Sequence, residues 1–528
     1  MSTDNPALEP QATLIQALLE PGRYPHPVSR PQLIETHISW LILTGEFVYK
    51  FKKALDLGFL DYSTLEQRRY FCEEELRLNR RTAPQLYLEV TPVSGSPAAP
   101  RLGDASAPIE YAVKMRQFPQ DALFRHLLQR DRLTAGLIDQ LAGTIAAFHG
   151  EIDIAPPERP YGRPGTVFRP VQENFRQIRE HLRNGESLEQ LERIECWAKE
   201  EYRQRKSLMQ HRHDAGFIRE CHGDLHLNNI ALLEDRPVLF DAIEFNPELR
   251  FIDVISEAAF LMMDLEANRR SDLAWRFLNH YLEINGDYAS LPLLRFYRCY
   301  RAMVRAKINA IRVTQPGLDP ATREQSLQDF HAYLDLADGY TRPARAHLLI
   351  THGLSGSGKT ALSQQLLEHW PAVRLRSDVE RKRMARLRAE QRSGSGIDAG
   401  LYTPAMSDRT YRRLRELAKL VLRTGYHVIV DAAFLQAAQR EPFRNLAREL
   451  HVPFHVLAAE AGTATLRKRV AARHARGSDA SEADLAVLHH QLEHYVPLQP
   501  EEQSEVIRVD TEGKIDFRVI LENLHRIS

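Results

Sequence analysis

The sequence has 528 residues, of which 43% are hydrophobic and 27% are charged. This composition is ordinary for a folded soluble protein and excludes a largely disordered or collagen-like chain, while the length predicts two or three domains. The 70 Lys and Arg residues balance the 70 Asp and Glu residues, so a chain-wide basic surface for nucleic acid is excluded and only a local basic patch would serve that purpose.

Four cysteines are spread along the chain, at Cys72, Cys196, Cys221 and Cys299, and none forms a C-x-x-C pair. We therefore expect neither a disulfide framework nor a zinc site or other metal cluster. The N-terminus shows no basic start followed by an apolar run, and no stretch approaches the ~18–20 apolar residues that span a bilayer. The expectation is a cytoplasmic protein without a membrane partner.

The first predicted elements are a β-hairpin, a helix and two further strands, which together would form a small sheet lobe. They cover, in order, Ile38–Leu43, Phe47–Lys52, Leu65–Arg81, Tyr87–Pro92 and Ile109–Arg116. From Asp121 onward the pattern is mainly helical. We therefore expect an α+β bilobal domain, with the small lobe over about 30–118 and a helical lobe over about 119–313.

The strongest signal in this half is His222-Gly-Asp224-Leu-His-Leu-Asn-Asn229, which resembles the H-G-D-x-x-x-x-N catalytic loop of the aminoglycoside-phosphotransferase group, itself related to protein kinases. The spacing lets Asp224 accept or orient the proton of an acceptor hydroxyl while Asn229 turns back to ligate Mg²⁺. An apolar strand then ends at Asp241, which resembles the second magnesium-binding acid of those kinases. Asp253 resembles an acid that braces the loop.

The resemblance also implies a lysine for the nucleotide phosphates and a helical Glu that holds it. Lys50 is the preferred lysine because it shares one strand face with Val48, which would cover the adenine. Lys52 lies on the same face and is the alternative. Glu75 is the preferred partner, with Glu74 as the alternative.

The sequence departs from this kinase pattern in two places. No glycine-rich loop precedes the lysine, only Thr44-Gly45, and Leu227-Asn228 stands where Pro-Gly is frequent. The first departure weakens the expectation of tight nucleotide binding, whereas the second still allows a backbone turn. Met115 begins the segment that we expect to contact adenine.

Turn and breaker residues gather between Thr314 and Arg345, around a short polar helix predicted over Ala321–Ala337. An apolar run, His347–Thr351, then leads into a stretch of glycines. We therefore place the boundary near residue 340, with one domain over 1–340, a second over 341–528 and a linker over about 314–345.

The second half alternates apolar strand runs with helical patterns, which predicts an α/β three-layer fold with a parallel sheet. The predicted strands are His347–His352, Val373–Arg376, His427–Asp431, Phe454–Ala458 and Val506–Val509. The predicted helices are Lys359–His369, Val379–Gln391, Arg409–Arg423, Gln436–Leu450, Ala464–Ala475 and Ser481–His494.

The segment from Gly353 to Thr360 fits the P-loop pattern G-x-x-x-x-G-K-[ST] and lies between a predicted strand and a predicted helix. Glycines let backbone N–H groups curl around phosphate oxygens, and the helix N-terminus adds partial positive charge. Lys359 would reach the β- and γ-phosphates, and the Thr360 hydroxyl would ligate Mg²⁺. The expected ATP-binding residues are Gly353, Ser355, Gly356, Ser357, Gly358, Lys359 and Thr360.

This half resembles the small P-loop kinases of the polynucleotide-kinase and gluconate-kinase group. Asp378 and Arg381 match that group's D-x-x-R pattern, which implies a base for the acceptor hydroxyl and a clamp for substrate or anion. Asp431 ends an apolar strand like a Walker B acid that positions Mg²⁺, although Ala432 follows where a hydroxyl residue is frequent in that group. Asp378 also suits a plain helix N-cap. The arginines of the expected lid are Arg467, Arg469 and Arg473, and they precede Gly477-Ser478.

Two basic clusters bear on the substrate. One is a stripe of arginines on the predicted helix Leu294–Val313, and the other is the segment Arg374–Arg392 around Asp378. If these clusters face the sites, the acceptor is anionic, whereas the simpler interpretation of the stripe is a solvated helix face.

From Gln32 to Gln503 the chain resembles a two-domain bacterial protein in which an aminoglycoside-phosphotransferase-like domain precedes a P-loop kinase domain. The resemblance implies a bifunctional ATP/Mg²⁺-dependent phosphotransferase acting on the hydroxyl of an anionic or sugar-like small molecule. Two alternatives stay open. One is an RNA- or DNA-end kinase in the second half, with the first half as a helper. The other makes one domain a nucleotide-binding regulator of its neighbour.

Overall fold

The computed structural model describes residues 8–58, 60–182, 185–342, 345–389, 391, 393, 400–476 and 481–526. Three residues named from the sequence, Arg392, Gly477 and Ser478, lie outside this described part. The chain divides into two compact units. The first comprises residues 1–140, 147–176 and 202–264, and the second comprises 141–146, 177–201 and 265–528.

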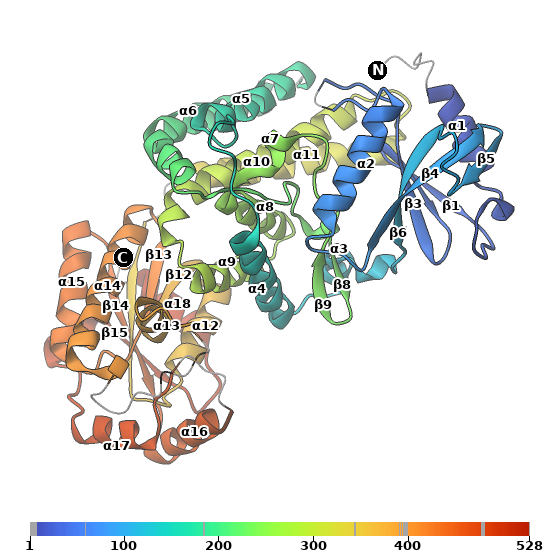
Figure 1. The fold of residues 1–528 in the computed structure, drawn as a ribbon. Coiled ribbons are helices and arrows are strands. Elements are labelled where there is room, and N and C mark those ends of the chain that lie inside the picture. Colours follow the sequence, from blue (N-terminus) through green and yellow to red (C-terminus); the bar gives the residue numbers. More distant parts are fainter. Residues whose placement is uncertain are drawn as a thin grey trace. The chain divides into compact units, whose positions relative to one another are not determined.

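The first unit begins with a six-stranded antiparallel sheet in the order β1-β2-β3-β6-β4-β5. Strand β3 shows why the small lobe forms, because its side chains alternate between the two faces. Tyr49 and Phe51 pack with helix α1, while Val48 packs on the opposite face in the cluster that contains Cys72 of helix α2. The sheet therefore lies between α1 and α2 (Figure 1). The predicted hairpin, helix and strands are confirmed, and α1, β1 and β5 were not predicted.

The remainder of the chain up to residue 267 is mainly helical and carries two short β-ladders, β7 with β10 and β8 with β9. In chain order the elements are α1 (Leu8–Ala17), β1 (Gln32–Glu35), β2 (Ser39–Leu43), β3 (Phe47–Lys52), α2 (Leu65–Asn79), β4 (Tyr87–Ser96), β5 (Ala99–Leu102), β6 (Glu110–Arg116), α3 (Phe124–Gln129), α4 (Ala135–Glu151), α5 (Pro164–His181), α6 (Gly185–Asp214), β7 (Ile218–Glu220), β8 (Ile230–Leu233), β9 (Arg236–Leu239), α7 (Pro247–Arg250), β10 (Phe251–Asp253) and α8 (Val254–Ala267).

The second unit contains a five-stranded parallel sheet in the order β12-β13-β11-β14-β15. Apolar side chains of α12 and α18, such as Leu366 and Leu524, pack with Leu349 and Ile429 on one face. Helix α14 contacts strand β13, and helix α15 contacts strand β11. These three layers confirm the predicted fold.

The elements of this unit after α8 are α9 (Ser271–Asn285), α10 (Leu291–Val313), α11 (Pro320–Thr341), β11 (Leu348–His352), α12 (Lys359–His369), β12 (Ala372–Arg376), α13 (Ser377–Met384), α14 (Pro404–Arg423), β13 (His427–Asp431), α15 (Ala437–Leu450), β14 (Phe454–Glu460), α16 (Thr463–Arg476), α17 (Leu485–Glu493), β15 (Val506–Asp510) and α18 (Phe517–Arg526). The five predicted strands and six predicted helices correspond to elements of the structure. The helix predicted over Val379–Gln391 is the shorter α13.

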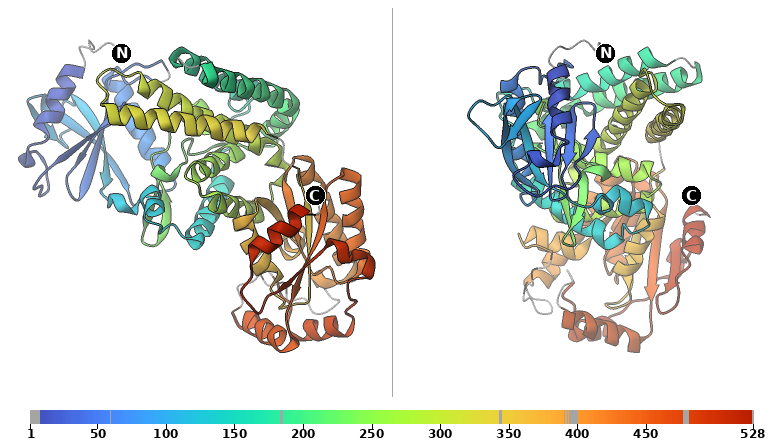
Figure 2. Two further views of the ribbon diagram at one scale, coloured as in Figure 1. Left: turned by 180° about the vertical axis from the view of Figure 1, so that it is seen from behind. Right: turned by 90° about the vertical axis from the view of Figure 1, so that its right-hand side faces the viewer.

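Helices α9, α10 and α11 belong to the same compact unit as the parallel sheet. Figure 2 shows α10 and α11 side by side as a long pair. Arg298 of α10 is buried, pairs with Glu266 and lies over the ring of Tyr340, and Arg301 is buried as well. Arg298 and Arg301 of the arginine stripe therefore lie in the interior of this unit, whereas Arg312 is exposed, so the stripe is only in part a solvated face. Among the described residues, no helix combines the length and hydropathy that a membrane span requires.

Candidate active sites

The loop with the H-G-D pattern brings Asp224 and Asn229 together in the first unit. The Asn229 side-chain nitrogen donates to the backbone carbonyl of Asp224 at 2.9 Å and to its carboxylate at 3.2 Å. His226 Nε2 lies 3.3 Å from the same carboxylate. The sequence reasoning overlooked His226, although its position two residues after Asp224 was a usable signal. Asp224 is thus oriented from two sides while its side chain stays 39% exposed.

Two acids of helix α8 hold the backbone of this loop. Glu257 accepts a hydrogen bond from the Gly223 N–H at 2.7 Å, and Asp264 accepts one from the Leu227 N–H at 2.9 Å. Asp253, which we expected to brace the loop, instead pairs with the buried Arg212 at 2.7 Å and 2.8 Å. The expectation for Asp253 is therefore wrong, because its carboxylate neutralises a buried guanidinium.

Glu257 also takes part in a buried group with His149 and Cys221, whose ligating atoms lie within 4.8 Å of one another. His149 Nε2 lies 2.8 Å from the Glu257 carboxylate. Burial raises the pKa of Glu257, but the contacts with His149 and the Gly223 N–H outweigh it and the net shift is downward. Since these contacts already engage the carboxylate, we interpret the group as a support of the catalytic loop.

Asp241 follows β9 and has a left-handed backbone with φ of 65°. A non-glycine residue in this region is strained, and such strain is typical of functional positions. The surroundings hold the backbone there: the Asp241 N–H donates to the Tyr87 hydroxyl at 3.1 Å, and the Ala242 N–H donates to the Asn79 side chain at 2.9 Å. The Asp241 side chain is 44% exposed and is available to a ligand.

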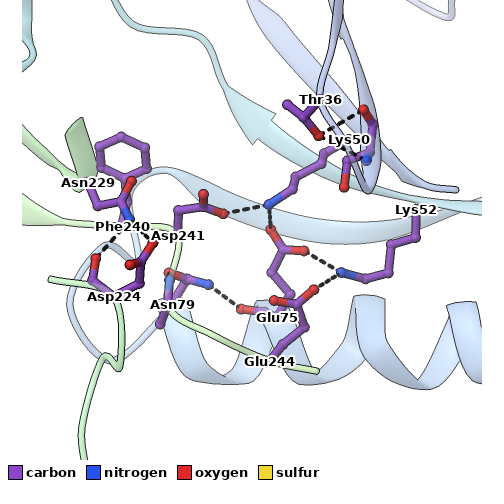
Figure 3. A network of polar contacts seen from close by, with 12 residues as sticks. Thr36, Lys50, Lys52, Glu75, Asn79, Asp224, Asn229, Phe240, Asp241 and Glu244 are labelled. Carbon is purple, nitrogen blue, oxygen red and sulfur yellow. Dashed lines mark hydrogen bonds and ion pairs between the residues drawn. The ribbon is translucent and has the colours of Figure 1, made fainter. Parts of the chain in front are cut away.

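Lys50 connects Asp241 to helix α2, as Figure 3 shows. Its ammonium donates to Glu75 at 2.8 Å and to Asp241 at 2.5 Å. Lys52 is fully buried and pairs with the other oxygen of Glu75 and with Glu244. Burial lowers the pKa of Lys50, but the carboxylates of Asp241, Glu75 and Glu244 outweigh it, so the net shift is well upward. Of the two lysines left open, Lys50 is the one that contacts Asp241.

Glu74, the alternative partner, pairs with Arg77 and Arg250 instead.

The segment between β1 and β2 is a tight turn, in which the Thr36 N–H donates to the Ser39 carbonyl at 2.9 Å. Met115 of β6 is buried opposite Val48 of β3, in the apolar cluster between the sheet and helix α2.

In the second unit, the P-loop lies between β11 and α12. Gly353, Gly356 and Gly358 have positive φ angles of 147°, 83° and 89°. A Cβ at Gly353 or Gly356 would stand 2.6 Å or 2.7 Å from a backbone carbonyl oxygen, so only glycine fits at these two positions. The hydroxyl of Ser357 is buried without a hydrogen-bond partner among the described residues. The loop thus leaves polar groups for a ligand.

Lys359 begins α12 and folds back onto the loop, where its ammonium donates to the carbonyls of Gly353 and Leu354 at 2.7 Å and 2.8 Å. Burial lowers the pKa of Lys359 to about 8, and the carboxylates of Asp431 and Asp378 only partly oppose this shift. The Ser355 N–H, which would face a phosphate, donates to the Gln491 side chain of α17 at 2.8 Å.

The acidic residues predicted for this site lie around the same pocket. Asp378 lies in the first turn of α13 and pairs with Arg381 at 3.0 Å; the N-cap of this helix is Arg376, so Asp378 is not an N-cap. Asp431 ends β13 and accepts a hydrogen bond from Ser363 of α12 at 3.2 Å. Arg473 of α16 donates to the Ala483 carbonyl at 2.9 Å.

A pocket of about 550 Å³ joins these groups. Its wall includes Ser355, Gly356, Gly358, Lys359, Thr360, Asp378, Arg381, Asp431 and Arg473 among the predicted residues, and Tyr402, Tyr411, Gln436 and Gln439 among those that the sequence reasoning overlooked. Tyrosines and glutamines such as these belong to no recognisable sequence motif, so only the folded structure shows that they line the pocket.

Most of the basic residues near Asp378 have acidic partners inside the unit. Arg374 and Arg376 pair with Glu283, and Lys382 pairs with Glu482. The Arg374–Arg392 cluster is thus partly neutralised, and of its members Arg376 and Arg381 line the pocket. These pairs weaken the support that the cluster lent to an anionic acceptor.

Both sites offer the hard oxygen ligands that Mg²⁺ prefers. In the first unit, Asn229 uses its side-chain nitrogen toward Asp224, which leaves its oxygen as the ligand atom beside Asp241. In the second unit, the Thr360 hydroxyl and the Asp431 carboxylate line one pocket. The residues present therefore fit a magnesium–nucleotide complex at each site.

Comparison with known proteins adds two sequence findings. A family model described as an AAA domain matches residues 348–498. The uncharacterized protein Rv2004c of Mycobacterium tuberculosis is 31% identical over 466 residues, which cover 88% of this chain and 91% of that protein. The uncharacterized protein Mb2027c of Mycobacterium bovis matches to the same extent. The relatives thus span both units.

Solved structures match one half at a time. The amicoumacin kinase hAmiN, in complex with AMP-PNP, Ca²⁺ and Ami, covers 62% of this chain and 93% of its own, at 12% identity and a TM-score of 0.38. A choline/ethanolamine kinase family protein from Mesorhizobium loti covers 62% and 99%, at 10% identity and a TM-score of 0.38. A putative kinase from Chloroflexus aurantiacus covers 35% and 99%, at 20% identity and a TM-score of 0.29. At these scores the fold assignment rests on the strand orders given above.

Proposed function

The chain belongs to the family of the mycobacterial protein Rv2004c, and on that premise we propose that it is a bifunctional ATP-dependent phosphotransferase with one transfer site in each unit. The observation that carries the proposal is the convergence of Lys359, Thr360, Asp378 and Asp431 on one pocket next to the P-loop. The arrangement of Asp224 beside Asn229 supports a second transfer site in the first unit.

At the first site, Asp224 orients the acceptor hydroxyl and receives its proton as the oxygen bonds to the γ-phosphorus and the bond between the γ-phosphorus and ADP breaks. Asn229 and Asp241 would hold Mg²⁺, which supplies positive charge against the phosphate oxygens. Lys50 would exchange its contact with Asp241 for the nucleotide phosphates and keep its contact with Glu75. His226 keeps the Asp224 carboxylate in place.

At the second site, backbone N–H groups of the P-loop would surround the phosphates. Lys359 would leave the carbonyls of Gly353 and Leu354 and contact the β- and γ-phosphates. Asp378 takes the proton of the acceptor hydroxyl, a new O–P bond forms, and the bond between the γ-phosphorus and ADP breaks. Arg381 and Arg473 would stabilise the charge on the transferred group.

Thr360 and Asp431 would hold Mg²⁺ at this site, where the ion would supply positive charge against the phosphates. The acceptor proposed for this site is a small hydroxylated molecule. Tyr402, Tyr411, Gln436 and Gln439 give the pocket ring faces together with hydrogen-bond donors and acceptors, which suits a sugar-like compound. Arg381 lies over the Tyr402 ring and lines the pocket, so it is the residue best placed for an anionic group on the acceptor.

The test uses the purified full chain with ATP labelled on the γ-phosphate and a cell extract split into small-molecule and RNA fractions. Asp224→Asn, Lys359→Ala and the double variant are assayed beside the unsubstituted protein. We expect label in the small-molecule fraction, with one labelled product lost in each single variant and both lost in the double variant.

Two other outcomes would change the proposal. Label that enters RNA and disappears only in Lys359→Ala would make the second site a nucleic-acid end kinase. Label transfer that is unchanged in Asp224→Asn would assign the first unit a regulatory role instead of a catalytic one.

A further inference from the structure

Helix α9 contacts the elements that form the P-loop site, although its own sequence contains no motif that predicts this. The helix ends at Asn285, well before the matched residues 348–498, and yet it belongs to the same compact unit as the P-loop. Three of its features contact elements around the pocket: an asparagine, a glutamate and the carbonyl groups of its last turn.

The asparagine completes an edge of the parallel sheet. Strand β12 is an edge strand of the sheet, so its outward-facing peptide groups need hydrogen-bond partners outside the sheet. Asn279 supplies both, because its side-chain oxygen accepts from the Arg374 N–H at 2.6 Å and its nitrogen donates to the Ala372 carbonyl at 2.8 Å. Asn279 is 1% exposed. These two hydrogen bonds fix the position of α9 along β12, the strand that leads to Asp378.

The glutamate holds two arginines of the same strand. One oxygen of Glu283 accepts from Arg374 at 2.7 Å and 3.0 Å, and the other accepts from Arg376 at 3.3 Å. Glu283 is 8% exposed and Arg374 is 3% exposed, so this ion pair is shielded from water. Arg376 continues to the pocket wall.

Arg374 carries the contact onward to the P-loop helix. Its remaining terminal nitrogen lies 3.4 Å from the Thr360 carbonyl and 3.4 Å from the Ser363 hydroxyl. Ser363 in turn donates to Asp431 at 3.2 Å. Glu283 is thus connected through one buried guanidinium to the first turn of α12 and to Asp431, the residues proposed to hold Mg²⁺.

The end of α9 is fixed at the same time. Arg383 of α13 donates to the carbonyls of Glu283 and Ile284 at 2.7 Å and 3.2 Å. The helix stops at Gly286, whose φ is 74°, and a Cβ there would stand 2.5 Å from the Arg383 guanidinium. These contacts leave Glu283 little freedom to move away from Arg374.

We propose that Glu283 is a positioning residue of the P-loop site: through Arg374 it sets the Thr360 hydroxyl and the Asp431 carboxylate for the magnesium complex of the nucleotide. This inference rests on the proposed function of the second unit. It predicts a defect that is specific to magnesium-bound nucleotide, because Glu283 acts through Arg374 on the proposed metal ligands.

The experiment measures binding of a fluorescent ATP analogue to the full chain in a Lys50→Ala background, which leaves nucleotide binding to the second site. Affinity is determined with excess Mg²⁺ and with EDTA, and thermal unfolding is recorded in parallel. For Glu283→Gln we expect about a tenfold loss of affinity with Mg²⁺, the size expected from losing a hydrogen bond to a charged group, and less than about a threefold change with EDTA.

A matched control lies on the same helix. Arg276 pairs with Glu368 of α12 at 2.9 Å, so Arg276→Gln also removes an ion pair between α9 and the P-loop helix, at a place outside the series of contacts that runs from Glu283 through Arg374. We expect Arg276→Gln to bind the nucleotide normally under both conditions. An equal loss in both variants, or a loss in Glu283→Gln that is the same with EDTA, would reduce Glu283 to a structural role and overturn the inference.

A second variant covers the case in which Glu283→Gln does not fold. Arg374→Lys keeps a positive partner for Glu283 and shortens the reach toward Thr360, so it should reproduce the magnesium-specific loss; unchanged binding in this variant overturns the inference. The proposed function fails separately, if the analogue does not bind the Lys50→Ala protein or binds equally well after Lys359→Ala is added.

Discussion

Lys50 and Lys359 are the two lysines assigned to nucleotide phosphates, and their neighbours differ. Lys50 pairs with the carboxylates of Glu75 and Asp241, and its pKa lies well above the ordinary value despite burial. In the described part of the chain, the Lys359 ammonium donates to the backbone carbonyls of Gly353 and Leu354, and burial lowers its pKa to about 8. The same side chain is thus held as a fixed cation in one unit and as a titratable group in the other.

The difference shows two ways to prepare a phosphate site. In the first unit, side-chain ion pairs hold the lysine in place before any ligand arrives, at the cost of a contact that the ligand must displace. In the second unit, a glycine-rich backbone supplies the pre-shaped surface, and the lysine needs only the phosphates to become fully stabilised as a cation. The following predictions test this contrast.

The largest effect is expected for the catalytic acid of the first unit. Asp224→Asn removes the proton acceptor and should reduce label transfer at that site by about 10²–10⁴-fold, the usual contribution of a general base. Transfer that depends on Lys359 should not change. Asp235→Asn, in an exposed turn of the same region, is the matched control and should behave like the unsubstituted protein. A comparable loss in both variants would contradict the assignment.

The next effect concerns the two neighbouring lysines of β3. Lys52→Met leaves Glu75 and Glu244 buried with less compensating charge, and should lower the free energy of unfolding by about 3–5 kcal/mol. Lys50→Met should cost less, because Glu75 keeps Lys52 and Asp241 is partly exposed to water. Thermal or urea unfolding of both variants measures the difference. Equal losses would show that the two lysines do not divide these roles.

The pH dependence of nucleotide affinity sharpens the contrast directly. Phosphates bind the protonated lysine, so affinity at the second site should fall as the pH rises through about 8, by about tenfold between pH 7 and pH 9. At the first site, the raised pKa of Lys50 keeps that lysine charged over the same range, and its affinity should not fall for this reason. Binding titrations of Lys50→Ala and Lys359→Ala proteins separate the two. A flat profile in the Lys50→Ala protein would contradict the prediction.

The smallest effect is expected from a histidine cluster in the second unit. His347, His427 and His455 lie at the start of β11, β13 and β14, where burial lowers their pKa values to about 4, 3 and 4. The unfolded chain takes up protons on these side chains below pH 6.5 while the folded chain does not, so stability is full above that pH and declines as the pH falls. Unfolding at pH 7 and pH 6 should differ by on the order of 1 kcal/mol, and His347→Gln should reduce the difference.

Much of the second unit was predictable because its signals are local. The helix Lys359–His369 and the strand His427–Asp431 have the predicted ends, since the P-loop and the apolar runs define them over a few consecutive residues. The pairing of Asp224 with Asn229 is similarly local, because one turn of chain separates them.

Predictions that required a distant partner fared less well. The loop is braced by Glu257 and Asp264 instead of Asp253, and the arginine stripe of α10 lies partly in the interior instead of facing solvent. In each case the sequence shows a charged residue at a plausible spacing, but its partner comes from another helix and is chosen by packing.

The amino-acid sequence alone determined the two unrelated folds, the P-loop and the order of acids in the first site, because each depends on periodicity or on backbone geometry within a short segment. Only the tertiary structure decided which lysine contacts Asp241, which residues line the acceptor pocket, and that α9 reaches Arg374. These decisions rest on long-range contacts between buried charges, whose stability depends on the surrounding packing and desolvation and is not encoded in any local pattern.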